Sequence, residues 1–133
     1  MLLNDFYTVI HRSGPETESS QTGIPTKRYR FTLELNPGHP VYAGHFPGNP
    51  VVPGVCQVQM IHELLSGMQG SVLRLIYADT VKYMSLMVPD KNRVIDADIL
   101  AGTAENGEIS ANATLREGET IFIKFKGSFR KEI

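Results

Sequence analysis

The sequence predicts an α+β domain in which a curled antiparallel sheet wraps round one long buried helix. Two observations lead to this prediction: several segments alternate apolar and polar residues with the period of a strand, and the segment 53–69 is mostly apolar without that alternation. Several antiparallel strands and one apolar helix have few ways to bury their apolar surfaces together, and wrapping the sheet round the helix is the natural one. The 133 residues are expected to form a single domain, residues 1–133, with a sizeable core.

Three segments precede the helix. Residues 2–11 are rich in apolar side chains and fit a strand or a short helix. Residues 12–26 contain several Ser, Gly and Pro residues, which predicts an exposed, mobile loop. In residues 28–35, Tyr29, Phe31, Leu33 and Leu35 alternate with polar residues, which predicts a half-buried strand.

The predicted helix runs from Pro53 to about Gln69 and is apolar on nearly every side. We therefore expect it to be buried inside the domain and not laid on its surface. Its apolar residues are Val55, Val58, Met60, Ile61, Leu64, Leu65 and Met68.

The second half of the chain is predicted to consist of strands. Segments 72–77 and 80–88 are rich in β-branched and aromatic residues, and 93–100 follows them. Asn106-Gly107 predicts a tight hairpin, and Glu117-Gly118 predicts a second turn. Strands with alternating side chains follow both turns.

Composition excludes several classes of function. The formal net charge of -1 gives no reason to expect a nucleic acid or an anionic membrane as a partner. Cys56 is the only cysteine, so no intrachain disulfide is possible, and the four histidines do not have metal-ligand spacing. The sequence lacks a signal-peptide pattern and any apolar segment of membrane-spanning length, so we expect a cytoplasmic protein. The residues suggest no metal or cofactor.

The segment 43–55, AGHFPGNPVVPGV, is the most informative part of the chain. It places His45 among prolines, which fix φ, and glycines, which permit a positive φ, so it specifies one backbone path. Residues 44–55 resemble the active-site signature of the β-hydroxyacyl-acyl-carrier-protein dehydratases, G-H-F-P-G-x-P-x-x-P-G-V, whose fold is called the hotdog fold. The resemblance covers the chain from about residue 28 onward and implies a curled sheet round the central helix.

The resemblance also implies roles for individual residues. His45 matches the general base that removes the α-proton, and Gly54 matches the glycine whose N–H polarises the thioester carbonyl. A backbone N–H at a helix start is a suitable donor for that charge. Phe46, Pro53 and Val55 are expected to contact the substrate.

The family carries an acid fourteen residues after its histidine, but this chain has Gln59 there. A glutamine is not a useful proton donor at neutral pH. Gln59, His62, Glu63 and Ser66 form a polar stripe on the helix, and the family's two residue types occur at 59 and 63 in swapped order. Two interpretations remain open. Glu63 could act as the substitute acid, with His62 contacting substrate, or the stripe could face solvent or a subunit interface.

These observations predict a (3R)-hydroxyacyl-[acyl-carrier-protein] dehydratase-like enzyme of fatty-acid or related acyl-chain synthesis. Its expected substrate is an acyl chain carried by acyl carrier protein or coenzyme A. By resemblance it forms a homodimer or a larger homo-oligomer. Two alternatives stay open: a catalytically weak acyl-binding paralogue, suggested by Gln59, and a thioesterase on the same fold.

Overall fold

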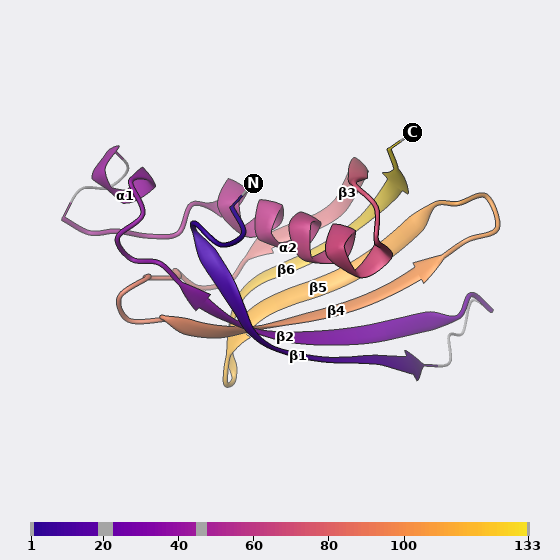
Figure 1. Cartoon of the computed structure of the whole chain (residues 1–133), viewed down its shortest axis with the longest axis horizontal. Coiled ribbons are helices and arrows are strands. Elements are labelled where there is room, and N and C mark those ends of the chain that lie inside the picture. The colour runs from indigo at the N-terminus through magenta and orange to yellow at the C-terminus, as the bar shows by residue number, and fades with distance from the viewer. Residues whose placement is uncertain (1, 19–22, 45–47, 133) are drawn as a thin grey trace.

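A computed structural model describes residues 2–18, 23–44 and 48–132. Within these residues six strands form one antiparallel sheet in the order β1-β2-β4-β5-β6-β3. Figure 1 shows the sheet curling round the helix α2, which lies along its concave face. The elements are β1 (Tyr7–Glu18), β2 (Thr26–Leu35), α1 (Val41–Gly44), α2 (Gly54–Gln69), β3 (Leu73–Tyr83), β4 (Val94–Thr103), β5 (Ile109–Glu117) and β6 (Thr120–Lys131).

The helix α2 agrees with its predicted span but is buried on only part of its circumference. Met60, Ile61 and Leu65 are fully buried and belong to the core between helix and sheet. Val55, in contrast, is 75% exposed. At 16 residues α2 is also an ordinary helix in length. The expectation of a long helix buried on every side is therefore not met, because a single sheet covers one side of a helix and leaves the other open.

The predicted loop over residues 12–26 is wrong for its first half, because β1 continues to Glu18. β1 pairs with β2 from Tyr7↔Leu35 to Glu18↔Thr26, and a register shift between Ser13 and Glu16 accommodates Gly14 and Pro15. The composition of this segment is that of a loop, but backbone pairing with β2 holds it extended.

The two strands predicted at 72–77 and 80–88 are a single strand, β3, followed by a loop. Register shifts between Leu75 and Tyr77 and between Ala78 and Thr80 let the strand continue past Asp79. The remaining strands agree with the predictions, and both predicted turns occur, with Gly107 and Gly118 at positive φ.

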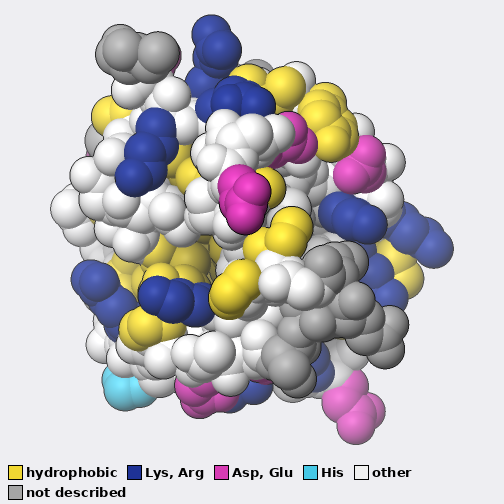
Figure 2. Space-filling model, turned by 90° about the vertical axis from the view of Figure 1, so that its right-hand side faces the viewer, with side chains coloured by type: hydrophobic (Ala, Val, Ile, Leu, Met, Phe, Trp, Pro, Cys, Tyr) yellow, Lys and Arg dark blue, Asp and Glu magenta, His cyan; other side chains and the backbone are white. Residues whose placement is uncertain are grey.

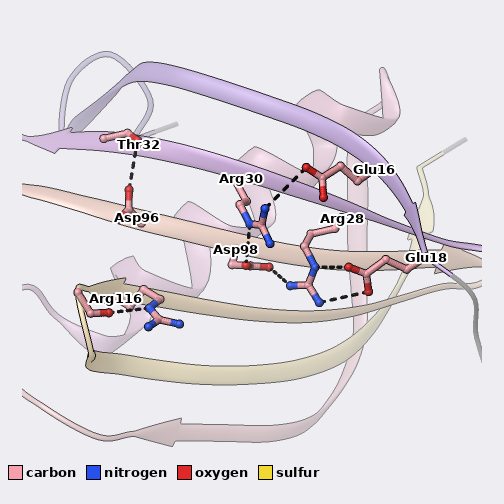
Figure 3. Close-up of polar contacts among 9 residues, drawn as sticks. Glu16, Glu18, Arg28, Arg30, Thr32, Asp96, Asp98 and Arg116 are labelled. Atoms are coloured by element: carbon pink, nitrogen blue, oxygen red, sulfur yellow. Dashed lines mark hydrogen bonds and ion pairs between the residues drawn. The ribbon is translucent and has the colours of Figure 1, made fainter.

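The outward face of β1, β2 and β4 carries a connected set of ion pairs (Figure 3). Arg28 binds Glu18 and Asp98, and Arg30 lies 3.4 Å from the same Asp98 carboxylate and 3.7 Å from Glu16. The Arg28 guanidinium lowers the pKa of Glu18. These ion pairs join three neighbouring strands. Each charge therefore has a partner of opposite sign on the sheet itself.

The two edges of the sheet differ. β1 carries Glu16 and Glu18, two of the acidic partners in these ion pairs, whereas β3 presents apolar side chains along the opposite edge. Ile76, Tyr77, Val81 and Tyr83 are each 40–50% exposed. A strand edge with exposed apolar side chains is a surface on which another chain can pair.

Within the described residues, no helix has the length and apolar character needed to cross a membrane.

Candidate active site

His45 and Phe46, the predicted base and one predicted substrate contact, lie outside the described residues. The chain on both sides of them is described. α1 ends at Gly44, immediately before His45, and Gly48 has a φ of 88°, in the left-handed region that favours glycine. Further on, the Val52 N–H donates to the Met87 carbonyl at 2.8 Å, which attaches the end of the segment to the loop after β3.

The segment leads directly into the first turn of α2. Pro53 occupies the N-cap position, its carbonyl accepts from the N–H groups of Cys56 and Gln57, and no described side chain caps the helix. The first N–H groups of a helix have no acceptor within it. Among the described residues, no hydrogen bond uses the N–H of Gly54, which leaves it available to polarise a carbonyl.

Gly54 is also the point at which β3 meets α2. The ring of Tyr83, the last residue of β3, lies so close that a Cβ added at Gly54 would be 2.5 Å from its Cζ and 2.6 Å from its hydroxyl oxygen. No larger residue fits at 54 without displacing this ring. Partial burial raises the pKa of Tyr83, so the hydroxyl keeps its proton at neutral pH.

A cavity of about 440 Å³ opens at this end of α2. Pro53, Gly54 and Val55 line it together with Tyr83, so three of the predicted site residues meet there. Gln57 also lines it and is only 3% exposed. Its amide nitrogen donates to the Val52 carbonyl at 3.4 Å, while its Oε1 has no hydrogen-bond partner among the described residues.

The other predicted residues lie elsewhere. Gln59, His62 and Glu63 line a separate cavity of about 660 Å³ between α2, the start of β3 and the N-terminal segment. The cavities at the two places have no lining residue in common. The sequence-predicted site is thus divided between the first turn of α2 and the stripe that follows it.

Glu63 is 8% exposed, and this chain's own donors occupy both oxygens of its carboxylate. The N–H groups of Leu2 and Leu3 donate to it at 2.8 and 2.9 Å. The Tyr7 hydroxyl donates at 3.2 Å and the Gln59 amide at 2.9 Å. Glu63 therefore attaches the N-terminal segment to α2, and in this arrangement neither oxygen is free for a substrate.

Two other residues of the polar stripe, His62 and Ser66, also bind backbone groups of another segment. The His62 ring nitrogen Nε2 contacts the Leu73 carbonyl at 2.5 Å, and the Ser66 hydroxyl accepts from the Leu73 N–H at 3.2 Å. Burial and the neighbouring Glu63 raise the pKa of Tyr7 well above its ordinary value. Within one copy of the chain, Glu63 is buried, and His62 and Ser66 bind the Leu73 backbone while remaining half-buried, so the stripe is not a fully solvated face. Its place in a subunit interface remains a prediction.

Sequence reasoning missed Tyr83, Gln57 and the N-terminal segment. Tyr83 reads as one more aromatic residue of a strand, and only the pairing of β3 beside α2 brings it to Gly54. Gln57 was a visible signal, because it is a polar residue inside an apolar helical segment. Nothing in residues 2–7 indicates that their N–H groups meet Glu63.

A curled antiparallel sheet round one helix, with a Gly-His-Phe-Pro segment leading into that helix, is the arrangement of the hotdog dehydratases. The model of the ApeI-like family, described as ApeI dehydratase, matches residues 19–119. This match spans most of the chain, and the chain therefore belongs to the ApeI-like dehydratase family.

Individual relatives agree with this assignment. The chain is similar to the 3-hydroxyacyl-[acyl-carrier-protein] dehydratase FabZ of Acetivibrio thermocellus, with 28% identity over 71% of this chain and 69% of that protein. It is also similar to FabZ of Syntrophomonas wolfei, with 24% identity over 74% and 77% of the two chains. Among solved structures, the dehydratase heterocomplex ApeI:P from Xenorhabdus doucetiae has the same fold, with a TM-score of 0.63, 18% identity and coverage of 92% and 96%.

Proposed function

We propose that this chain removes water from a 3-hydroxyacyl thioester during fatty-acid or related acyl-chain synthesis, with His45 as the general base. One observation carries the proposal: the Gly44–Val55 signature leads into the start of α2, where no described residue pairs with the Gly54 N–H. The relatives named FabZ support a substrate carried by acyl carrier protein. A cytoplasmic location remains a prediction.

The reaction requires two groups that this chain offers. His45 takes the proton from C2, and the electron pair of that C–H bond moves toward the thioester carbonyl, whose oxygen gains negative charge. The Gly54 N–H stabilises that charge. The C3–O bond then breaks, a C2=C3 double bond forms, and the hydroxyl leaves as water after gaining a proton. Pro53 and Val55 are proposed to line the substrate's path with Phe46.

The source of that last proton distinguishes two functions. One of the two open interpretations made Glu63 a substitute acid, with His62 contacting substrate, but the occupied Glu63 oxygens favour a structural role for the stripe. Gln59, at the family's acid position, cannot supply the proton. This observation favours a second candidate, a catalytically weak acyl-binding paralogue.

Turnover of a 3-hydroxyacyl carrier-protein substrate tests the proposal. We expect the wild type to release water and the His45→Ala variant to lose at least about 100-fold in kcat with unchanged thermal melting. Activity of His45→Ala close to that of the wild type would contradict the assigned base. Hydrolysis of an acyl-coenzyme A without dehydration would instead indicate the thioesterase alternative.

Two helix variants separate the enzyme from the weak paralogue. A substitute acid at 63 predicts that Glu63→Gln lowers turnover of an active wild type by about 100-fold or more. A weak paralogue predicts a nearly inactive wild type, no change in Glu63→Gln, and a sharp increase in Gln59→Glu. Because Glu63 holds the N-terminal segment, both variants are assayed at a temperature where circular dichroism shows them folded.

We propose that two copies of the chain associate through the β3 edge. β3 is an edge strand of the sheet and carries exposed apolar side chains, as described above. A two-fold axis at the middle of the strand pairs β3 with itself in antiparallel orientation, which extends the sheet across both copies. The end of β3 in one copy, at Tyr83, then lies beside the start of β3 in the other.

This pairing has a consequence for the substrate's approach. Arg74, near the start of β3, lines a cavity of about 500 Å³ together with Arg130 and Lys131. Figure 2 looks at the right-hand end of the view in Figure 1, where Lys and Arg side chains surround a hollow that contains hydrophobic ones. In the proposed dimer this end of one copy approaches the α2 start of the other. Glu132 lines the same cavity and Arg130 pairs with Glu108, so Arg74 and Lys131 are the cations proposed to attract the phosphate of the phosphopantetheine arm that carries the acyl chain.

Sedimentation tests the dimer. We expect the wild type to be a dimer at micromolar concentration and Val81→Lys, on the β3 edge, to shift it toward monomer. Ile10→Lys is the matched control, because Ile10 is similarly exposed, at 54% against 41%, but lies on the opposite edge strand. A monomeric wild type would refute the proposal, and mixed association only with a different subunit would indicate a heterocomplex.

A further inference from the structure

We propose that the Tyr83 hydroxyl is a second hydrogen-bond donor to the substrate's thioester oxygen, beside the Gly54 N–H. This inference rests on the proposed function and assigns a residue that neither the signature nor the comparisons identify. Its starting point is the contact between the tip of the Tyr83 ring and the first residue of α2.

The geometry brings two donors to one place. A Cβ built on Gly54 would lie 2.6 Å from the Tyr83 hydroxyl oxygen. The hydroxyl is therefore close to the Gly54 backbone. No hydrogen bond within the described residues uses this hydroxyl, although that of Tyr77 on the same strand contacts Glu108 at 3.2 Å. Tyr83 keeps its proton at neutral pH because burial raises its pKa.

The cavity beside them has walls that suit an acyl chain. It measures about 440 Å³, and Val55, Leu86 and Met87 line it together with Tyr83. Gln57 also lines it, but its Oε1 is buried and its amide nitrogen donates to the Val52 carbonyl, so neither polar atom is offered to a ligand. The Gly54 N–H and the Tyr83 hydroxyl remain as donors to a thioester carbonyl.

The chemistry uses the two donors at the same moment. Removal of the C2 proton by His45 places negative charge on the thioester oxygen. A pair of donors binds this charged oxygen more strongly than it binds the neutral carbonyl oxygen of the substrate. Tyr83 transfers no proton in this step. Its contribution is expected mainly in kcat, because the hydrogen bond strengthens as charge develops.

The test compares Tyr83→Phe with Tyr77→Phe. Both residues lie on β3 and are about half exposed, at 50% and 48%, and both substitutions remove only a hydroxyl. The ring that packs on Gly54 is retained in Tyr83→Phe, so its melting temperature should equal that of the wild type. We expect Tyr83→Phe to lower kcat by roughly 10- to 100-fold and to raise KM by no more than roughly fivefold, and Tyr77→Phe to change neither.

A binding measurement separates this inference from the proposed function. The probe is a 3-hydroxyacyl pantetheine amide, which keeps the carbonyl but does not react. In calorimetry, Tyr83→Phe should weaken its binding by roughly fivefold, the loss of one hydrogen bond, and Tyr77→Phe should not.

Each outcome decides between the claims. If the wild type binds the probe but does not turn over the substrate, the dehydratase function is refuted. The role of Tyr83 is then tested by comparing the probe's Kd for the wild type with its Kd for Tyr83→Phe. The role of Tyr83 is overturned if Tyr83→Phe and an active wild type have equal kcat values. If the wild type has no turnover, equal probe binding by the two proteins overturns it. A wild type that neither turns over nor binds overturns both.

Discussion

The first turn of α2 and the polar stripe that follows it are adjacent on one helix but differ in how their polar groups are used. At the first turn, the Gly54 N–H and the Gln57 Oε1 lack partners within the described chain. In the stripe, Glu63, His62 and Ser66 all bind backbone groups of other segments. A row of polar residues on an apolar helix can therefore be structural, whereas the end of α2 that we propose to be functional has backbone and side-chain groups without partners among the described residues.

Glu63 provides the largest expected effect on stability. Glu63→Ala removes the acceptor for four donors, so we expect the free energy of unfolding to fall by about 3 kcal/mol. Urea denaturation measures this change. Glu119→Ala, at an exposed turn, is the control and should alter stability by less than about 0.5 kcal/mol. Similar values for the two variants would show that the stripe does not hold the N-terminal segment.

Gly54 tests the close approach at the start of the helix. Gly54→Ala places a Cβ 2.5 Å from Tyr83 Cζ, which must move, and because Tyr83 is half exposed we expect a loss at the low end for overpacking, about 1–1.5 kcal/mol in stability. Gly67→Ala in the same helix is the matched control, because nothing lies within 4 Å of its added Cβ. It should stabilise the protein by about 0.5–1 kcal/mol, since alanine favours a helix interior.

A double variant attributes the Gly54 effect to Tyr83. When Tyr83→Ala is already present, Gly54→Ala should cost much less than it does alone, because the clashing ring is gone. If Gly54→Ala lowers the free energy of unfolding equally in the wild type and in Tyr83→Ala, the ring does not contact Gly54.

Tyr7 gives the smallest effect at neutral pH and a distinct one at high pH. Tyr7→Phe removes one donor from Glu63 and should cost about 1 kcal/mol. Because the pKa of Tyr7 is raised in the folded protein, its phenol ionises first in the unfolded chain above about pH 10. Stability from this residue is thus complete below that pH and is lost as pH rises further.

Denaturation curves at pH 8 and above pH 10 check this dependence. The wild type should lose more stability between the two pH values than Tyr7→Phe does. Tyr83→Phe should lose nearly as much stability between the two pH values as the wild type does, because the half-exposed Tyr83 has no carboxylate partner among the described residues and only its partial burial raises its pKa. Parallel curves for wild type and Tyr7→Phe would contradict the pairing of Tyr7 with Glu63.

Local sequence was sufficient for most of the fold. The alternation in 28–35 predicted β2, the apolar segment predicted α2 within one residue, and Asn106-Gly107 predicted the hairpin between β4 and β5. Periodicity and turn chemistry act over a few residues, so they can be read directly. The predictions failed where pairing with another strand determined the local structure. This is the case for β1 from Arg12 to Glu18 and for β3, which is a single strand.

The sequence by itself determined the family signature, the start of α2 at Pro53-Gly54 and the absence of an acid at Gln59. Only the tertiary structure decided that Glu63 binds residues 2–7 and that Tyr83 lies on Gly54. The physical reason is that these contacts join residues far apart in the chain. Which donor reaches a carboxylate, or which ring meets a glycine, depends on the curvature and pairing of the whole sheet, and no local pattern records it.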